Sequence, residues 1–162
     1  MKLAILTVSD TRTRANDTSG DLLDERARAA GHTVAARELV RDDRYVLRAV
    51  VSQWIADANV DAVIVTGGTG VTTRDVTVEA LRPLLDKEIE GFGEVFRWLS
   101  YKDVGTSTIQ SRALGGIANG TLIFCLPGST RACQLGWDEL LKPQLDSANK
   151  PCNFAELLPR LR

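Results

Sequence analysis

Strand-like and helix-like patterns alternate along this chain of 162 residues. Strands are predicted at residues 3–8, 33–40, 61–67 and 121–126. The runs "LAILTV" and "TLIFCL" are as continuously apolar as strands that are covered on both faces. Because helical stretches separate the first three segments and the connections are short, the pattern predicts an α/β fold. Its sheet should be mostly parallel, with helices on both faces.

The helical pattern is clearest after the second strand, where apolar residues recur at positions 47, 50, 51, 54, 55 and 58. Further helices are expected from Thr18 or Ser19 to Gly31, at about 77–85 with Pro83 disturbing its later part, at 93–101, at 107–114, and around Cys133 up to Pro143. Residues 87–93 fit neither pattern. No repeat or linker divides the chain, so we expect one domain over residues 1–162, with a C-terminal tail from about residue 146.

The charge and the cysteines restrict the class of protein. A formal net charge of −1 provides no basic field for nucleic acid, and no apolar run is near the roughly 20 residues needed to cross a bilayer. Cys125, Cys133 and Cys152 contain no CxxC pair, which argues against disulfides and zinc and favours a reducing cytoplasm. The one histidine, His32, stands in a predicted turn, so we expect chemistry without histidine.

In a parallel sheet all strand carboxyl ends share one edge, and ligands bind there. The segments that follow the four strands are "SDTRTRANDTSGD", "RDD", "GGTGVTTRD" and "PGST", and they are rich in Gly, Ser, Thr, Asp and Arg. We expect them to form the site together. The candidate substrate- or phosphate-binding residues are Ser9, Asp10, Asp17, Gly67, Gly68, Thr69, Gly70, Gly128 and Ser129.

The stretch "IVTGGTGVTTRD", residues 64–75, carries the strongest motif. Glycine permits positive φ, so the amides of Gly67, Gly68 and Gly70 could point into one concavity and hold an anion, with the Thr69 hydroxyl as a further donor. The lysine of a nucleotide-binding P-loop is absent, and so is a GxGxxG fingerprint after the first strand. The alternative is a tight turn without a ligand.

Two aspartates at this edge of the sheet predict a site for a bound cation. Asp75 would repel a bound phosphate unless a cation stood between them, and Mg²⁺ is usually held by one or two carboxylates together with substrate phosphates. Asp42 follows the second strand and should reach the same edge. The competing interpretation is that these acids only cap helices: Asp75 the next one, and Asp42 or Asp43 the one that starts near Arg44.

Together these segments resemble the MoaB/MogA family of molybdenum-cofactor biosynthesis. The glycine-rich stretch fits the family's signature, and "LTVSDTR", "EIEGFGEVFR", "TSTIQSRALGG" and "LIFCLPGST" stand in the family's order, so the resemblance covers nearly the whole chain. The closing "KPCNF" is most similar to the bacterial MoaB branch. The resemblance implies a Rossmann-like, three-layer α/β/α, molybdopterin-binding fold that assembles into trimers or hexamers.

The resemblance also implies an activity, the adenylylation of molybdopterin by Mg·ATP with release of pyrophosphate. Asp42 and Asp75 match the family's catalytic pair and would be the Mg²⁺ ligands. The attacking phosphate monoester has a second pKa of about 6, so it needs no general base at neutral pH. Two alternatives stay open: a non-catalytic molybdopterin-binding scaffold oligomer of the MoaB type, and an unrelated nucleotide-binding module. Glu94 and Arg112 stand in family-like motifs without an assigned role.

Overall fold

The computed structural model describes residues 1–161, and its centre is a six-stranded sheet with the order β2-β1-β3-β6-β5-β4. The strands are β1 (Lys2–Val8), β2 (Thr33–Val40), β3 (Ala62–Thr66), β4 (Lys87–Glu88), β5 (Leu114–Ala118) and β6 (Thr121–Leu126). β2, β1, β3 and β6 are parallel to one another, whereas β5 is antiparallel to both of its neighbours. The predicted α/β fold with a mostly parallel sheet is confirmed.

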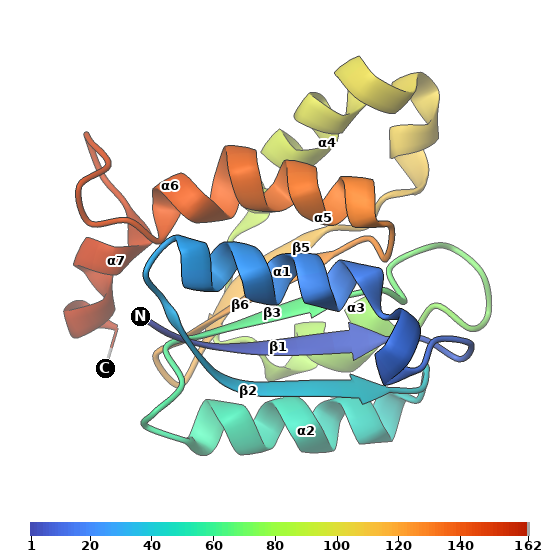
Figure 1. Cartoon of the computed structure of the whole chain (residues 1–162), viewed down its shortest axis with the longest axis horizontal. Coiled ribbons are helices and arrows are strands. Elements are labelled where there is room, and N and C mark those ends of the chain that lie inside the picture. The colour runs from blue at the N-terminus through green and yellow to red at the C-terminus, as the bar shows by residue number, and fades with distance from the viewer. Residues whose placement is uncertain (162) are drawn as a thin grey trace.

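Helices cover both faces of the sheet and give the molecule three layers (Figure 1). The helices are α1 (Thr18–Ala29), α2 (Arg44–Ala56), α3 (Thr77–Leu81), α4 (Glu90–Val104), α5 (Thr130–Gly136), α6 (Lys142–Gln144) and α7 (Phe154–Leu157). One hydrophobic core joins the sheet to α1, α4 and α5, and a second core joins its other face to α2 and α3. The implied α/β/α layering is therefore observed.

The strand β1 shows why a continuous apolar run was needed. Leu3 and Ile5 lie in the core beneath α1, while Ala4 and Leu6 lie in the core above α2, and all four side chains are fully buried. Burial of one large aliphatic side chain stabilises a fold by about 1.5–3 kcal/mol. An alternating polar strand would lose one of these two layers.

Helix capping differs in part from the expectation. The cap of α1 is Asp17, one residue before the predicted Thr18, and its carboxylate accepts from the Gly20 amide at 3.0 Å. The cap of α2 is Asp43, whose carboxylate accepts from the amides of Tyr45 and Val46 at 2.8 and 3.0 Å. Since Asp43 caps α2, the carboxylate of Asp42 does not act as the helix cap.

The helix predicted at 107–114 is correct only in its first half. Residues 105–110 form a 3₁₀-helix, and the antiparallel strand β5 begins at Leu114. Its glycines are packing requirements, because an added Cβ on Gly115 would lie 2.7 Å from Phe92 and one on Gly116 would lie 2.4 Å from Leu85. Only a strand without side chains at these two positions fits between the two residues.

Other boundaries moved less. Helix α3 ends at Leu81, and Pro83 lies in the 3₁₀ turn that follows, as its fixed φ led us to expect. The ambiguous segment 87–93 contains β4 and the start of α4. The last predicted helix is α5, and it continues through a π-helical turn at Trp137–Leu141 and past Pro143 to Gln144.

His32 lies in a turn, as expected, and the three cysteines are free thiols. Cys125 and Cys133 are buried, which raises the pKa of their thiols to about 12 and about 11, and Cys152 is exposed. His32 lies in the turn before β2, where its amide donates to the Ala27 carbonyl at 3.0 Å. Across residues 1–161 no helix is long and apolar enough to cross a membrane.

Candidate functional site

The carboxyl ends of β1, β2, β3 and β6 meet at one edge of the sheet, on the right in Figure 1. β1 lies between β2 and β3, so the strand order reverses at β1. In open α/β sheets, ligands bind in the crevice at such a reversal. The glycine loop, residues 67–75, follows β3 and therefore starts at this position.

Two residues of the glycine loop have positive φ angles, +101° at Gly67 and +63° at Gly68. The Gly67 amide donates to the Leu126 carbonyl at 3.0 Å, and the Gly67 carbonyl accepts from the Thr77 hydroxyl at 2.8 Å. The Thr77 amide donates to the Gly68 carbonyl at 2.9 Å. The loop is thus fastened to β6 and α3, and the Gly67 amide, predicted as a phosphate donor, is already used inside the fold.

Gly70 does not have the positive φ that we expected; it makes room for Asp75. A Cβ on Gly70 would lie 2.8 Å from Oδ2 of Asp75, and that oxygen accepts from the amide and the hydroxyl of Thr72 at 2.8 and 2.6 Å. Burial alone would raise the pKa of Asp75, but these hydrogen bonds, together with the Gly70 amide and the Arg112 charge, lower it. Asp75 is therefore an ionised member of the loop, and the cap position of α3 belongs to Val76.

Asp42 approaches the same loop from the end of β2. A Cβ on Gly68 would lie 2.7 Å from Oδ1 of Asp42, so only glycine leaves space for this carboxylate. Burial, and then the negative charges of Asp10 and Asp75, raise the pKa of Asp42. The structure therefore brings the two predicted acids together, at an electrostatic cost that a bound cation would relieve.

Arg74 supplies the compensating positive charge. Its Nε and Nη2 donate to the two carboxylate oxygens of Asp10 at 2.8 and 2.9 Å, and Nη2 also donates to the Asp42 carbonyl at 3.0 Å. This pairing with Arg74 lowers the pKa of Asp10. Three connections, those after β1, β2 and β3, are thereby joined at the crevice.

The other predicted residues have different surroundings. Asp17 is fully buried and accepts from Thr7, Gly20 and Arg37, so we propose that it supports the edge from beneath instead of contacting a ligand. Ser129 caps α5, accepting from the Ala132 amide at 3.1 Å.

The remaining predicted residues lie on the edge itself. Ser9 accepts from two amides of its own turn, and Thr69 is 2% exposed. A Cβ on Gly128 would lie 3.1 Å from Gly67 Cα, so glycine at 128 lets the connection after β6 touch the glycine loop.

Two further residues were not found as site residues from the sequence: Arg112, which contacts the glycine loop, and Glu79, which pairs with Arg112. Arg112 donates to the carbonyls of Thr69 and Asp75, and Glu79 pairs with its guanidinium. The motif around Arg112 drew attention, but no local pattern pairs it with Glu79, which lies 33 residues away.

The residues at the edge fit a magnesium ion that is shared with a substrate. No group of three or more His, Cys, Asp or Glu side chains in residues 1–161 could hold a metal without help. Asp75 is nonetheless close to Asp42: its negative charge, after burial and the charge of Asp10, raises the pKa of Asp42. Two carboxylates completed by phosphate oxygens and water are the usual environment of Mg²⁺.

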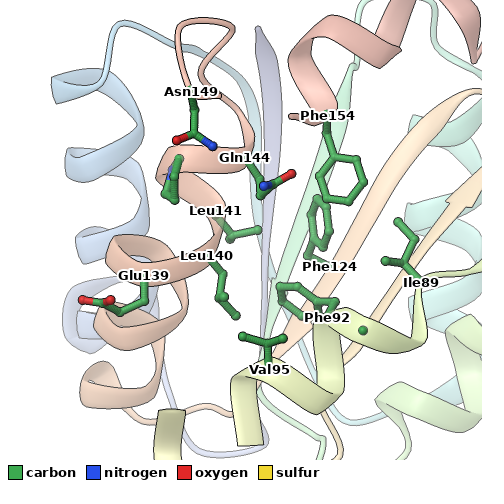
Figure 2. Close-up of a pocket in the computed structure, with 12 residues that line it drawn as sticks. Ile89, Phe92, Val95, Phe124, Glu139, Leu140, Leu141, Gln144, Asn149 and Phe154 are labelled. Carbon is green, nitrogen blue, oxygen red and sulfur yellow. The ribbon is translucent and has the colours of Figure 1, made fainter. Parts of the chain in front are cut away.

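An apolar pocket elsewhere in the molecule lacks the features of a magnesium or phosphate site. It has a volume of about 420 Å³ and lies between the start of α4, the α5–α6 region and the C-terminal tail (Figure 2). Phe124 forms its floor, with ring centroids 4.9 Å from Phe92 and 5.7 Å from Phe154. This pocket shares no residue with the glycine loop, and its lining offers little to a polyphosphate.

We expect Asp42→Asn to raise the melting temperature at pH 7 by about 2 °C. The raised pKa of Asp42 means that ionising this group destabilises the fold as pH rises from the ordinary value of 3.8 through the raised pKa. The gain should therefore shrink towards pH 4, as thermal unfolding between pH 4.5 and 8 will show. Backbone hydrogen bonds from Val46 and Tyr45 lower the pKa of Asp43, so Asp43→Asn should not stabilise. A loss of stability for Asp42→Asn at pH 7 would contradict the crowding of these acids.

Fold and edge together define an α/β protein that places a glycine loop and converging carboxylates at the carboxyl ends of its parallel strands, an arrangement suited to phosphorylated ligands. The chain belongs to the family whose model is described as "Probable molybdopterin binding domain", which matches residues 4–147. The resemblance to the MoaB/MogA family of molybdenum-cofactor biosynthesis is thus confirmed.

Individual relatives agree with this assignment. The chain is 54% identical over 153 residues to Molybdenum cofactor biosynthesis protein B of Escherichia coli, covering 94% of this chain and 90% of that protein. A crystal structure of Molybdenum cofactor biosynthesis protein B superposes with a TM-score of 0.89 at 42% identity, covering 99% of this chain and 94% of the other. The tungsten cofactor synthesizing protein MoaB from Pyrococcus furiosus gives a TM-score of 0.81 at 39% identity, covering 89% and 91% of the two chains. The protein takes part in molybdenum-cofactor biosynthesis.

Proposed function

We propose that this protein transfers the adenylyl group of ATP to molybdopterin and releases pyrophosphate, with Mg²⁺ held at the glycine loop. The observation that carries the proposal is the approach of Asp42 and Asp75 to Gly68 and Gly70, the two positions where a Cβ would strike their carboxylates. The family membership supports molybdopterin as the acceptor. The free, buried thiols support a cytoplasmic location for the same protein.

The reaction needs stabilised anions more than it needs a base. The terminal phosphate of molybdopterin attacks the α-phosphorus of ATP, and the bond to pyrophosphate breaks. The attacking phosphate is ionised at neutral pH, which fits a crevice without histidine, because His32 precedes β2 and lies at the opposite end of the strands. Positioning and charge neutralisation are then the main contributions to the rate.

Each side chain at the edge has a distinct part. Asp42 and Asp75 would ligate Mg²⁺, which neutralises phosphate charge when it is bound. The remaining amides of the glycine loop would donate to phosphate oxygens, because the Gly67 amide donates to the Leu126 carbonyl and those of Gly70 and Thr72 donate to the Asp75 carboxylate. Ser9, Asp10 and Ser129 border the crevice on the connections beside it.

The test is a direct assay of the purified protein with molybdopterin, ATP and Mg²⁺. Pyrophosphate and adenylylated molybdopterin should appear in equal amounts, and neither should form when Mg²⁺ is chelated. Absence of both products from folded protein that still binds molybdopterin would reject the enzymatic proposal.

A second function, that of a molybdopterin-binding scaffold, has one observation in its favour. Within the described chain no three-residue metal cluster exists, so the carboxylates alone do not specify a resident ion. A scaffold would bind molybdopterin with the same affinity whether or not Mg·ATP is present. Calorimetric titrations with and without Mg·ATP separate the two proposals.

We propose further that the protein assembles into a trimer or hexamer through α4. The exposed aromatic and aliphatic side chains of α4 and the following turn are Val95, Trp98, Tyr101, Val104 and Ile109. Trp98 is 61% exposed, and α4 projects beyond the body of the molecule (Figure 1). Apolar side chains gathered in this way mark interaction surfaces.

Trp98→Glu should therefore shift the protein from three or six chain masses towards the monomer, as measured by light scattering at about 10 µM. A charge in the centre of an apolar interface costs several kcal/mol when it is buried without a partner. Tyr45→Glu is the matched control, because this tyrosine is 73% exposed but lies on α2. A monomeric parent protein, or loss of assembly in the control alone, would contradict an interface on α4.

A further inference from the structure

Arg112, in the motif "TSTIQSRALGG", had no role assigned from the sequence, but it makes two hydrogen bonds with the glycine loop. Its Nε donates to the Thr69 carbonyl at 3.1 Å, and its Nη2 donates to the Asp75 carbonyl at 3.3 Å. Glu79 of α3 accepts from both Nη atoms, with Nη2 at 3.1 Å from Oε2. One guanidinium therefore joins the loop, α3 and the segment that leads into β5.

The two loop carbonyls stand at either side of the exposed part of the loop. Residues 71–74 are all exposed, whereas Thr69 is buried and Asp75 is partly buried. A segment whose two ends are fixed by one rigid group loses less conformational entropy when a ligand orders it. Arginine suits this task, because its planar fork holds several acceptors in fixed directions.

Glu79 gives the guanidinium its orientation. The fork-to-fork pair is charge-assisted, and each partner is partly shielded from water, with side chains 30% and 40% exposed. The pair leaves the Nε and one Nη2 hydrogen directed at the loop carbonyls. The contact with Asp75 is to its carbonyl, so it does not compete with the hydrogen bonds that the Asp75 carboxylate accepts from Thr72.

We propose that Arg112, oriented by Glu79, is a positioning residue that clamps both ends of the loop segment 69–75 and so holds the Asp75 carboxylate opposite Asp42. The functional importance of this geometry rests on the adenylyl transfer proposed above. The clamp itself is a property of the unliganded protein and can be measured without turnover.

The first test is hydrogen–deuterium exchange of the intact protein. In Arg112→Gln the amides of residues 68–75 should exchange about ten times faster, while those of β1 and β3 keep their rates and so report unchanged global stability. Arg112→Lys should also exchange faster than the parent, because an ammonium group cannot reach three acceptors in one plane. Unchanged loop exchange in both variants would overturn the proposal.

Arg82→Gln is the matched control. Arg82 also makes a two-pronged pair with a glutamate, Glu88, with both distances at 3.0 Å, but it contacts no loop carbonyl. Its loss should leave exchange in the glycine loop unchanged. Glu79→Gln should give part of the Arg112→Gln effect, and the double variant no more than Arg112→Gln alone, because Glu79 acts through Arg112. Additive effects would contradict this order.

Kinetics provide the second readout. In Arg112→Gln we expect kcat to fall about 10- to 100-fold with the KM for ATP within about threefold, since a misplaced group costs rate more than binding. A raised KM with unchanged kcat would mean that Arg112 contacts the substrate and would overturn the positioning role. If the parent forms no product while loop exchange still rises in the variant, the adenylyl-transfer proposal fails and the clamp stands.

Discussion

Gly67→Ala should lower the free energy of unfolding by about 3–5 kcal/mol and the melting temperature by about 10 °C. Gly67 has φ at +101°, and an added Cβ would lie 2.1 Å from the Val8 carbonyl oxygen. Neither β1 nor β3 can withdraw, since the two strands are paired from Leu3–Ala62 to Thr7–Thr66, directly before Val8 and Gly67. The measurement is thermal and urea unfolding of the purified variant.

Gly31→Ala separates strain from collision. Gly31 also has a positive φ, +82°, but a Cβ there would meet nothing within 4 Å. Its replacement should cost only the backbone term, about 1 kcal/mol. Equal losses in the two variants would show that the approach of Gly67 to Val8 has no energetic weight.

Asp75→Asn should lower kcat/KM for adenylyl transfer by about 10²–10³-fold, the loss typical of removing one group that stabilises transition-state charge. Asparagine keeps the shape of the side chain and can still accept from the Thr72 amide, now at 2.8 Å, so the loop should stay folded. Steady-state rates of pyrophosphate release, measured over a range of Mg²⁺ concentrations, would report the loss.

Asp43→Asn is the control for that variant. Asp43 belongs to the same edge and neighbours Asp42, but its carboxylate caps α2, and asparagine caps helices about as well as aspartate. The rate should stay within about twofold of the parent. An Asp75→Asn enzyme as fast as this control would end the assignment of Asp75 as a magnesium ligand.

The four parallel strands of the sheet could be predicted from the sequence because their signals are local. β1, β2, β3 and β6 lie where apolar or alternating segments follow turn residues, and their order along the chain implies a shared edge. β5 was missed because its two glycines weaken any strand pattern. The two glycines leave room for Phe92 and Leu85, and these contacts form only in the folded chain.

The candidate site divides in the same way. Glycines and aspartates after strands are visible in the sequence, and so the approach of Asp42 and Asp75 to one loop could be expected. The division of work between Asp42 and Asp43 could not, because either residue can cap a helix. The burial of Asp17 depends on Arg37, twenty residues away, and the Arg112–Glu79 pair depends on the antiparallel return of β5.

The crevice is assembled from connections that each end a different strand of one sheet, and this has a practical consequence. A compound that contacts several of these connections holds together segments that separate only when the whole sheet unfolds. Its binding should therefore raise the denaturation temperature by mass action on the native state, by an amount set by the free concentration of the compound relative to its Kd. A library of pterins and nucleotides could be ranked by such thermal shifts alone, with no enzymatic turnover required.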